Sequence, residues 1–224
     1  MDIIADEELL KIRMDYLFTY ENGKMSQINE PWGCTTNAPL LFIGVTNQGQ
    51  ILYRFGKLAD SIFIQKAETL LLKKILDISI YLSELKSNRF CQEVCFYYPT
   101  KINSSTTNCR LLTTKDSSLL SLTFKDEVEE LETAQPFIGY FLNGQIVSIC
   151  RSVRKGKNGE EAGIETLPSH RRRGFAQSVL NCWISEVQKK NLTPFYSANI
   201  DNLASLNLAQ KTGFIMYAKT IEIY

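Results

Sequence analysis

The stretch AGIETLPSHRRRGFA, residues 162–176, decides the fold of this chain. An apolar run ends at Leu167, a short turn follows, and a helical pattern opens near Gly174, which predicts a strand, a turn and a helix. In the pattern Arg171-x-x-Gly174-x-Ala176, small residues stand where the backbone must come close to a ligand. Unpaired N–H groups and the positive end of the helix dipole make such a helix start an anion site suited to a diphosphate. An ordinary strand–turn–helix with an exposed basic cluster explains the same residues without a ligand.

The segments around this stretch have the pattern of a sheet covered by helices. Two apolar runs within residues 136–153 are split by Asn143-Gly144, a strong signal for a tight hairpin. Residues 173–190 repeat apolar side chains at helical spacing. We also expect a short helix at residues 203–212 and strands at residues 110–114, 162–167, 194–198 and 214–224. Together these segments predict an α/β fold with a mixed sheet.

A polar stretch, KINSSTTN at residues 101–108, is the predicted boundary between two parts of the chain. We divide the chain there into residues 1–104 and residues 105–224. The first part predicts an α+β region, with helices at residues 7–20 and 60–76, a hairpin at 40–55 and a strand at 93–98. It shows no chemical motif, and we expect it to lie on the substrate side or to pack against the second part.

Composition and charge argue against several classes of protein. The 224 residues carry 25 Lys and Arg against 24 Asp and Glu, a net charge of +1, so we expect no nucleic-acid partner and no membrane. The first ten residues are acidic, where a signal peptide needs positive charge, so we expect a cytoplasmic protein. A single histidine and six cysteines without a CxxC pair predict no metal site.

The sequence from Arg110 onward resembles the GNAT superfamily of N-acetyltransferases, in a branch with an extra N-terminal half. The resemblance is carried by four segments: RLLTTKD (110–116), PFIGYFLNGQIVSICRSVR (136–154), AGIETLPSHRRRGFAQSVLNCW (162–183) and PFYSANIDNLASLNLAQKTGF (194–214). It implies a GNAT-type mixed, mostly antiparallel sheet flanked by helices in the C-terminal half. It also implies acetyl-CoA as co-substrate, with no metal.

Ten positions match residues that hold coenzyme A in this family: Thr166, Leu167, Arg171, Arg172, Arg173, Gly174, Phe175, Ala176, Asn202 and Ser205. By the resemblance, the six residues of the loop hold the diphosphate on their main-chain N–H groups. The two residues before the loop offer backbone groups to the pantetheine arm and the acetyl carbonyl, at a place where two strands of the family's sheet splay apart. The last two begin a helix that reaches the coenzyme. The chain departs from the family at Ala209, where many relatives carry a tyrosine that protonates the leaving thiolate.

Glu165 is the leading candidate for the general base, or for the carboxylate that positions the amine. It is an ionisable residue in an otherwise apolar strand, where burial raises the pKa of a carboxyl toward neutrality. A salt bridge to Arg151 or Arg154 explains the same residue structurally. A bulge could also turn the strand and leave Glu160 or Glu161 as the base.

Two further residues, Tyr196 and Ser197, lie on the strand opposite the expected acetyl site and could contact substrate or supply a proton. His170 and Cys150 are better explained as a turn residue and a small buried residue.

The function that these observations favour is transfer of an acetyl group from acetyl-CoA to a primary amine by direct attack in a ternary complex. The alternative is a non-catalytic acyl-CoA-binding protein with a GNAT fold, which Ala209 favours. We expect the partner to be a small-molecule or peptide amine, and the protein to be a monomer or a homodimer. The sequence does not identify the amine.

Overall fold

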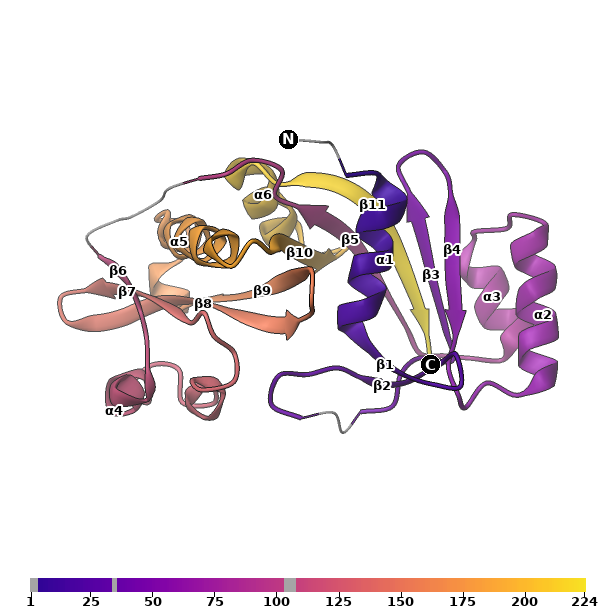
Figure 1. The fold of residues 1–224 in the computed structure, drawn as a ribbon, viewed down its shortest axis with the longest axis horizontal. Coiled ribbons are helices and arrows are strands. Elements are labelled where there is room, and N and C mark those ends of the chain that lie inside the picture. The colour runs from indigo at the N-terminus through magenta and orange to yellow at the C-terminus, as the bar shows by residue number, and fades with distance from the viewer. Residues whose placement is uncertain (1–3, 34–35, 103–107) are drawn as a thin grey trace.

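The computed structural model describes residues 4–33, 36–102 and 108–224, and its main feature is a nine-stranded sheet (Figure 1). The strands of this sheet are β3 (Leu41–Thr46), β4 (Ile51–Phe55), β5 (Phe90–Tyr97), β6 (Cys109–Leu111), β7 (Ile138–Leu142), β8 (Gln145–Lys155), β9 (Gly159–Thr166), β10 (Thr193–Asn199) and β11 (Ile215–Ile223). A separate two-stranded sheet consists of β1 (Phe18–Glu21) and β2 (Lys24–Ile28). The helices are α1 (Asp6–Leu17), α2 (Ser61–Leu72), α3 (Ile78–Leu85), α4 (Ser117–Leu120), α5 (Phe175–Lys189) and α6 (Leu203–Thr212).

The strand order is β4-β3-β11-β5-β10-β9-β8-β7-β6, and every pair is antiparallel except β9 with β10. The predicted α/β fold with a mixed, mostly antiparallel sheet flanked by helices is therefore confirmed. Strand β5, from the first part of the chain, lies between β10 and β11 of the second part. The division into residues 1–104 and 105–224 stays a prediction, and the sheet runs across it without a break.

The sheet opens between its two parallel strands. Strands β9 and β10 pair only at their beginnings, and the last pair is Phe195 with Glu161. Beyond it β10 stays paired with β5 as far as Asn199, while β9 stays paired with β8 as far as Thr166. The sheet therefore has two arms, which diverge in Figure 1: β6 to β9 form one, and β3, β4, β5, β10 and β11 form the other. We call the space where they part the splay.

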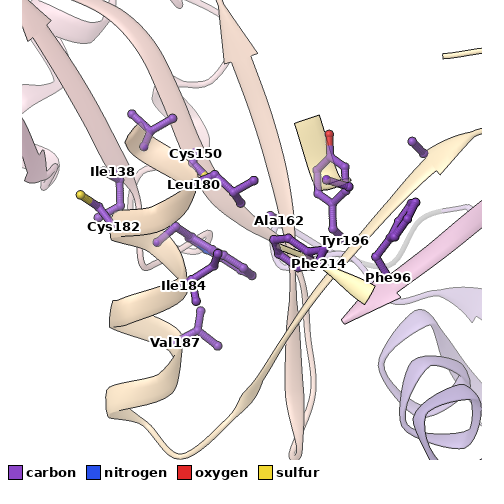
Figure 2. Packing of buried hydrophobic residues seen from close by; sticks show 14 of the residues in the cluster. Phe96, Ile138, Cys150, Ala162, Leu180, Cys182, Ile184, Val187, Tyr196 and Phe214 are labelled. Atoms are coloured by element: carbon purple, nitrogen blue, oxygen red, sulfur yellow. The ribbon is translucent and has the colours of Figure 1, made fainter. Parts of the chain in front are cut away.

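Helices cover both faces of the sheet. Alternate residues of a strand point to opposite faces, and on β5 Phe96 packs in the cluster under α5 while Cys95 packs in the cluster under α1. Figure 2 shows the first cluster, with Leu180 of α5 next to Cys150 of β8. The indole of Trp183, which is fully buried, donates a hydrogen bond to Ser152 on β8 at 3.0 Å. The α5 stripe expected from the sequence thus supplies the core of this face.

The first part of the chain differs from expectation in three places. The helix expected over residues 7–20 ends at Leu17, and the next residues form β1. The helix expected over residues 60–76 ends at Leu72 because the chain turns at Lys74, which has a φ of 53°. A separate helix, α3, then begins after Asp77, whose carboxylate accepts a hydrogen bond from the Ser79 N–H at 2.9 Å. The β1–β2 hairpin was not expected either, since its strands are short and mostly part-exposed.

Arg13 of α1 ties the two arms together at the splay. Its side chain is only 1% exposed, and its guanidinium donates to Glu161 on β9 and to Glu93 on β5. Tyr16, one turn further along α1, donates its hydroxyl to Glu161 Oε2 at 2.6 Å. Ser197 on β10 donates to Glu161 Oε1 at 3.0 Å. We call these five residues the Arg13 network; they link α1 to β9 on one arm and to β5 and β10 on the other.

Replacing Arg13 by methionine should strongly destabilise the protein. Arg13→Met keeps an apolar stem but leaves the buried Glu161 and the half-buried Glu93 without their cation, and we expect the free energy of unfolding in urea to fall by about 3–5 kcal/mol. Arg54→Met makes the same replacement at an exposed site on β4 and should cost less than about 0.5 kcal/mol. Equal losses in the two variants would show that the network does not hold the arms.

Candidate active site

The loop before α5 is shaped to receive an anion. Gly174 is the N-cap of α5 with a φ of 85°, and Arg172 also has a positive φ, of 60°. The N–H of Ser178 bonds the Gly174 carbonyl at 3.1 Å, so the N–H groups of the three residues before Ser178 lie in the first turn and have no acceptor within the helix. A Cβ built on Gly174 meets no atom within 4 Å, which shows that the space in front of this backbone is open. These features fit the diphosphate of a coenzyme.

The side chains of the loop are exposed but anchored. Arg171 donates from Nε to the Thr166 carbonyl at 3.2 Å, which ties the loop to the end of β9. The guanidinium of Arg173 lies over the Phe175 ring at 5.0 Å, and that ring is buried against Tyr140 at 4.6 Å. The backbone of the loop is thus held in place from both ends.

The end of β9 offers main-chain groups to the splay. The Leu167 N–H donates to the Val147 carbonyl on β8 at 3.0 Å. Because an antiparallel ladder alternates, the main-chain groups of Thr166 and Ile164 point the other way, toward the space that β10 has left. Of the two predicted strand-end residues, Thr166 therefore faces the splay with its N–H, while its carbonyl accepts from Arg171 and the Leu167 N–H is already used. Ile164 was missed, because sequence alternation does not reveal which main-chain groups are paired.

The start of α6 lies beside Tyr196. Asn202 is the N-cap of this helix, and its side chain accepts a hydrogen bond from the Ser205 N–H at 3.1 Å. Ser205 in turn hydrogen-bonds the phenol of Tyr196, and burial raises the pKa of Tyr196. Ala209, fully buried, packs in the same cluster, and Figure 2 shows Tyr196 next to Phe214 at its edge. The structure thus brings Tyr196, Ser205 and Asn202 together on the α5 side of the splay.

Glu165 does not have the environment expected for it. Its side chain is 46% exposed and pairs with Arg151 at 3.3 Å, which is the structural alternative considered above. The expected burial of Glu165 is wrong because β9 has no neighbour on the β10 side beyond Glu161. Arg151 also pairs with Glu130, and burial together with the nearby Glu165 raises the pKa of Glu127 to about 7.

The two carboxylates earlier in β9 point to opposite faces. Glu160 lies on the α5 side, where it accepts hydrogen bonds from Ser152 at 2.6 Å and from Lys190 at 2.9 Å. Glu161 lies on the α1 side, within the Arg13 network. The structure therefore brings Ser197 and Glu161 together at the point where the splay begins, and it places Tyr196 on the other face.

A cavity of about 120 Å³ opens next to Glu161 on the α1 side of the sheet. It is lined from both arms and from the chain that covers them: Arg13, Leu17, Phe18, Ile28, Cys91, Glu93, Arg154, Glu161, Glu222 and Tyr224. Three of these residues, Arg13, Glu93 and Glu222, were not predicted from the sequence. A signal for the last two was present, since each is an ionisable residue inside an apolar strand. A larger cavity, of about 280 Å³, lies at the opposite end of β10, and none of the predicted site residues lines it.

The carboxylates of the smaller cavity are poorly compensated. Burial, together with the nearby Glu93, raises the pKa of Glu222 to about 7, against the lowering effect of the Tyr224 hydroxyl at 2.7 Å. Burial also raises the pKa of Glu93, against the effect of Arg13. A proton acceptor that titrates near neutral pH therefore lies in this cavity.

The raised pKa of Glu222 predicts a pH-dependent stability. The stability associated with its neutral form is present below its ordinary pKa of 4.5 and is lost as the pH rises through about 7. Glu222→Gln cannot ionise, so its stability relative to the parent should be greater at pH 8 than at pH 5 in urea unfolding. Glu68→Gln, on the exposed face of α2, should show no such dependence. The same difference at both pH values for Glu222→Gln would contradict the assignment.

Neither a metal-binding cluster nor a membrane-spanning helix is found in the described ranges. Within residues 4–33, 36–102 and 108–224, no group of three or more His, Cys, Asp or Glu side chains is arranged to hold a metal ion. In the same ranges, no helix has the length and apolar character needed to cross a membrane.

Comparison with known proteins identifies the family to which the sequence is similar. The model of the GNAT acetyltransferase family matches residues 78–223. An uncharacterized N-acetyltransferase of Bacillus subtilis strain 168, YdfB, is 35% identical over 79 residues, which are 35% of this chain and 29% of that protein. The match thus spans less than a third of the length of this curated relative.

Solved structures support the same fold. A GNAT-family acetyltransferase from Colwellia psychrerythraea aligns over 100% of this chain and 98% of its own, with a TM-score of 0.51 and 12% identity. A protein assigned to the GNAT family from Novosphingobium aromaticivorans aligns over 62% of this chain and 67% of its own, with a TM-score of 0.51 and 17% identity. Since the family model covers well over half of the sequence, including the splayed strands and the loop before α5, the chain belongs to the GNAT acetyltransferase family.

Proposed function

We propose that this protein transfers an acetyl group from acetyl-CoA to a primary amine of a small molecule or peptide, by direct attack in a ternary complex. The observation that carries the proposal is the splay between β9 and β10. A helix start suited to a diphosphate lies on the α5 side of the sheet, and a carboxylate-lined cavity lies on the α1 side. A ternary complex needs two such sites that meet at one opening.

The coenzyme part of the site is assigned to the loop and the strand end. The free N–H groups at the start of α5 would hold the diphosphate, with Arg172 and Arg173 adding positive charge. The main-chain groups of Ile164 and Thr166 would hold the pantetheine arm, and Asn202 and Ser205 stay predicted contacts of the coenzyme. Acetyl-CoA, when bound, supplies the acetyl thioester.

We assign Glu161 the role of general base, which takes up the proton that the attacking ammonium must lose. An ammonium has no free electron pair, so it must lose a proton before its nitrogen forms the new bond to the acetyl carbon. Ser197 donates to Glu161 Oε1 at 3.0 Å, so its oxygen can accept this proton while its own passes to Glu161. Glu161 replaces Glu165 in this role because Glu165 is 46% exposed, whereas Glu161 lines the cavity and accepts from Ser197.

We assign Tyr196 the role of general acid, which donates a proton to the leaving thiolate as the C–S bond breaks. It lies on the α5 side with Ser205, in the same cluster as Ala209, and its raised pKa keeps the phenol protonated at neutral pH. Ala209 favours a non-catalytic acyl-CoA-binding protein because the usual tyrosine is absent from that position. The Tyr196 phenol would supply the missing proton donor. That alternative predicts coenzyme binding without turnover.

The direct test is a coenzyme A release assay on the purified chain with a panel of primary amines. Release that depends on both acetyl-CoA and one of the amines supports the proposal. Tight coenzyme binding with no release for any amine would support the non-catalytic alternative.

Coenzyme binding should depend on the bare backbone at Gly174. Gly174→Glu places a side chain and a like charge where the diphosphate approaches, so we expect acetyl-CoA affinity in calorimetry to fall at least 100-fold, about 3 kcal/mol. Gly144→Glu is a matched control, because Gly144 also has a positive φ and open space around its Cβ, but lies in the β7–β8 turn. Equal affinities in the two variants would move the coenzyme site elsewhere.

The two candidate bases can be separated by the same conservative change. Glu161→Gln should lower kcat about 10²–10⁴-fold with little change in acetyl-CoA affinity, since it keeps the shape and removes the proton acceptor. Glu165→Gln should stay close to the parent. The reverse result would return the role to Glu165. Circular dichroism of both variants checks that a loss of turnover is not a loss of fold.

A further inference from the structure

The cavity next to Glu161 carries more negative charge than its cations balance. Three carboxylates line it, those of Glu93, Glu161 and Glu222. Two guanidinium groups line it as well. That of Arg13 is shared between the first two carboxylates, and that of Arg154 pairs with Glu30 at 3.5 Å and also lowers the pKa of Glu93. The lining therefore has three carboxylates against two cations. Within the part of the chain that the structure describes, no lysine, arginine or histidine pairs with Glu222, and its hydrogen bond comes from Tyr224 at 2.7 Å. The cavity is therefore suited to a cation.

A second observation at the same cavity points to a ligand. Arg13 is 1% exposed and lines the cavity, yet its Nε has no hydrogen-bond acceptor among the described residues. Buried donors are almost always paired, with protein, water or ligand. A cationic ammonium has no acceptor atom, so a water that enters the cavity with it would complete this bond.

The size of the cavity limits what can enter. Its volume of about 120 Å³ is well below the roughly 300–1,000 Å³ of pockets that hold drug-sized ligands, so it suits a short aliphatic group. Leu17, Phe18 and Ile28 supply apolar walls for such a group. A bulky ring system or a folded protein surface does not fit in this space.

We propose that this cavity is the acceptor subsite, and that Glu222 and Glu93 are its specificity-determining residues, which select a compact aliphatic amine in its cationic form. The inference rests on the proposed function, because it takes the splay as the place of acetyl transfer. The ammonium group enters between the carboxylates, and the aliphatic part lies against Leu17, Phe18 and Ile28. Glu161, on the same wall, is then next to the nitrogen that must be deprotonated.

The first experiment measures binding without any turnover. The parent chain is titrated with n-butylammonium chloride, with 1-butanol and with sodium butyrate, each followed by thermal unfolding at equal ionic strength. We expect the ammonium salt to raise the melting temperature while the neutral and anionic compounds of the same length do not. Equal shifts for all three compounds, or no shift with any of them, would overturn the cation subsite.

The second experiment tests the two carboxylates. Glu222→Gln should weaken butylammonium binding and raise the KM for an accepted alkylamine at least tenfold, with the KM for acetyl-CoA unchanged. Glu93→Gln should act in the same direction, and Glu68→Gln on α2 should match the parent. An alkylamine KM in Glu222→Gln equal to that of the parent would overturn the inference.

The two proposals fail in different ways. If amines are acetylated but Glu222→Gln has no effect on them, the acceptor lies elsewhere while the proposed function stands. If butylammonium binds through Glu222 but calorimetry shows no coenzyme A binding, the cation subsite stands and the proposed function fails.

Discussion

The buried guanidinium of Arg13 is the contact on which the geometry of the site depends. It reaches Glu161 on one arm of the sheet and Glu93 on the other, beside the place where the β9–β10 ladder ends. Two strands that part lose their mutual hydrogen bonds, and the opening they leave must be held by something other than the sheet. A charged group from a helix on the α1 face does this without filling the opening. The strands can therefore stay apart and still be fixed.

This arrangement explains why the first part of the chain belongs to the site. Strand β5 supplies Glu93 and helix α1 supplies Arg13 and Tyr16, so one wall of the cavity comes from residues that carry no recognisable motif. The motif-bearing part, from β9 to α6, supplies the side that we assign to the coenzyme. In this proposal, the coenzyme site and the acceptor subsite are built by different parts of one continuous sheet.

The sequence predicted those features that depend on neighbouring residues. The β7–β8 hairpin, the apolar stripe of α5 and the Gly174 turn each follow from a few consecutive side chains. The insertion of β5 between β10 and β11 does not, because alternation marks a strand without naming its neighbours. The error at Glu165 has the same origin. A strand pattern implies burial only where another strand covers it, and β9 loses that cover after Glu161. The Arg13 network could not be predicted either, because its contacts depend on which strands and helices are neighbours.

The sequence separation within the Arg13 network also bears on how the chain folds. Arg13 and Glu161 are 148 residues apart, so during synthesis the helix emerges long before the carboxylate that it binds. Contacts between distant residues form late, because closing a long loop costs entropy before any contact repays it. Until β9 has joined the sheet, Arg13 can pair only with Glu93, on the arm that contains β5. The ion pair that ties the two arms together therefore forms only after most of the chain has been made.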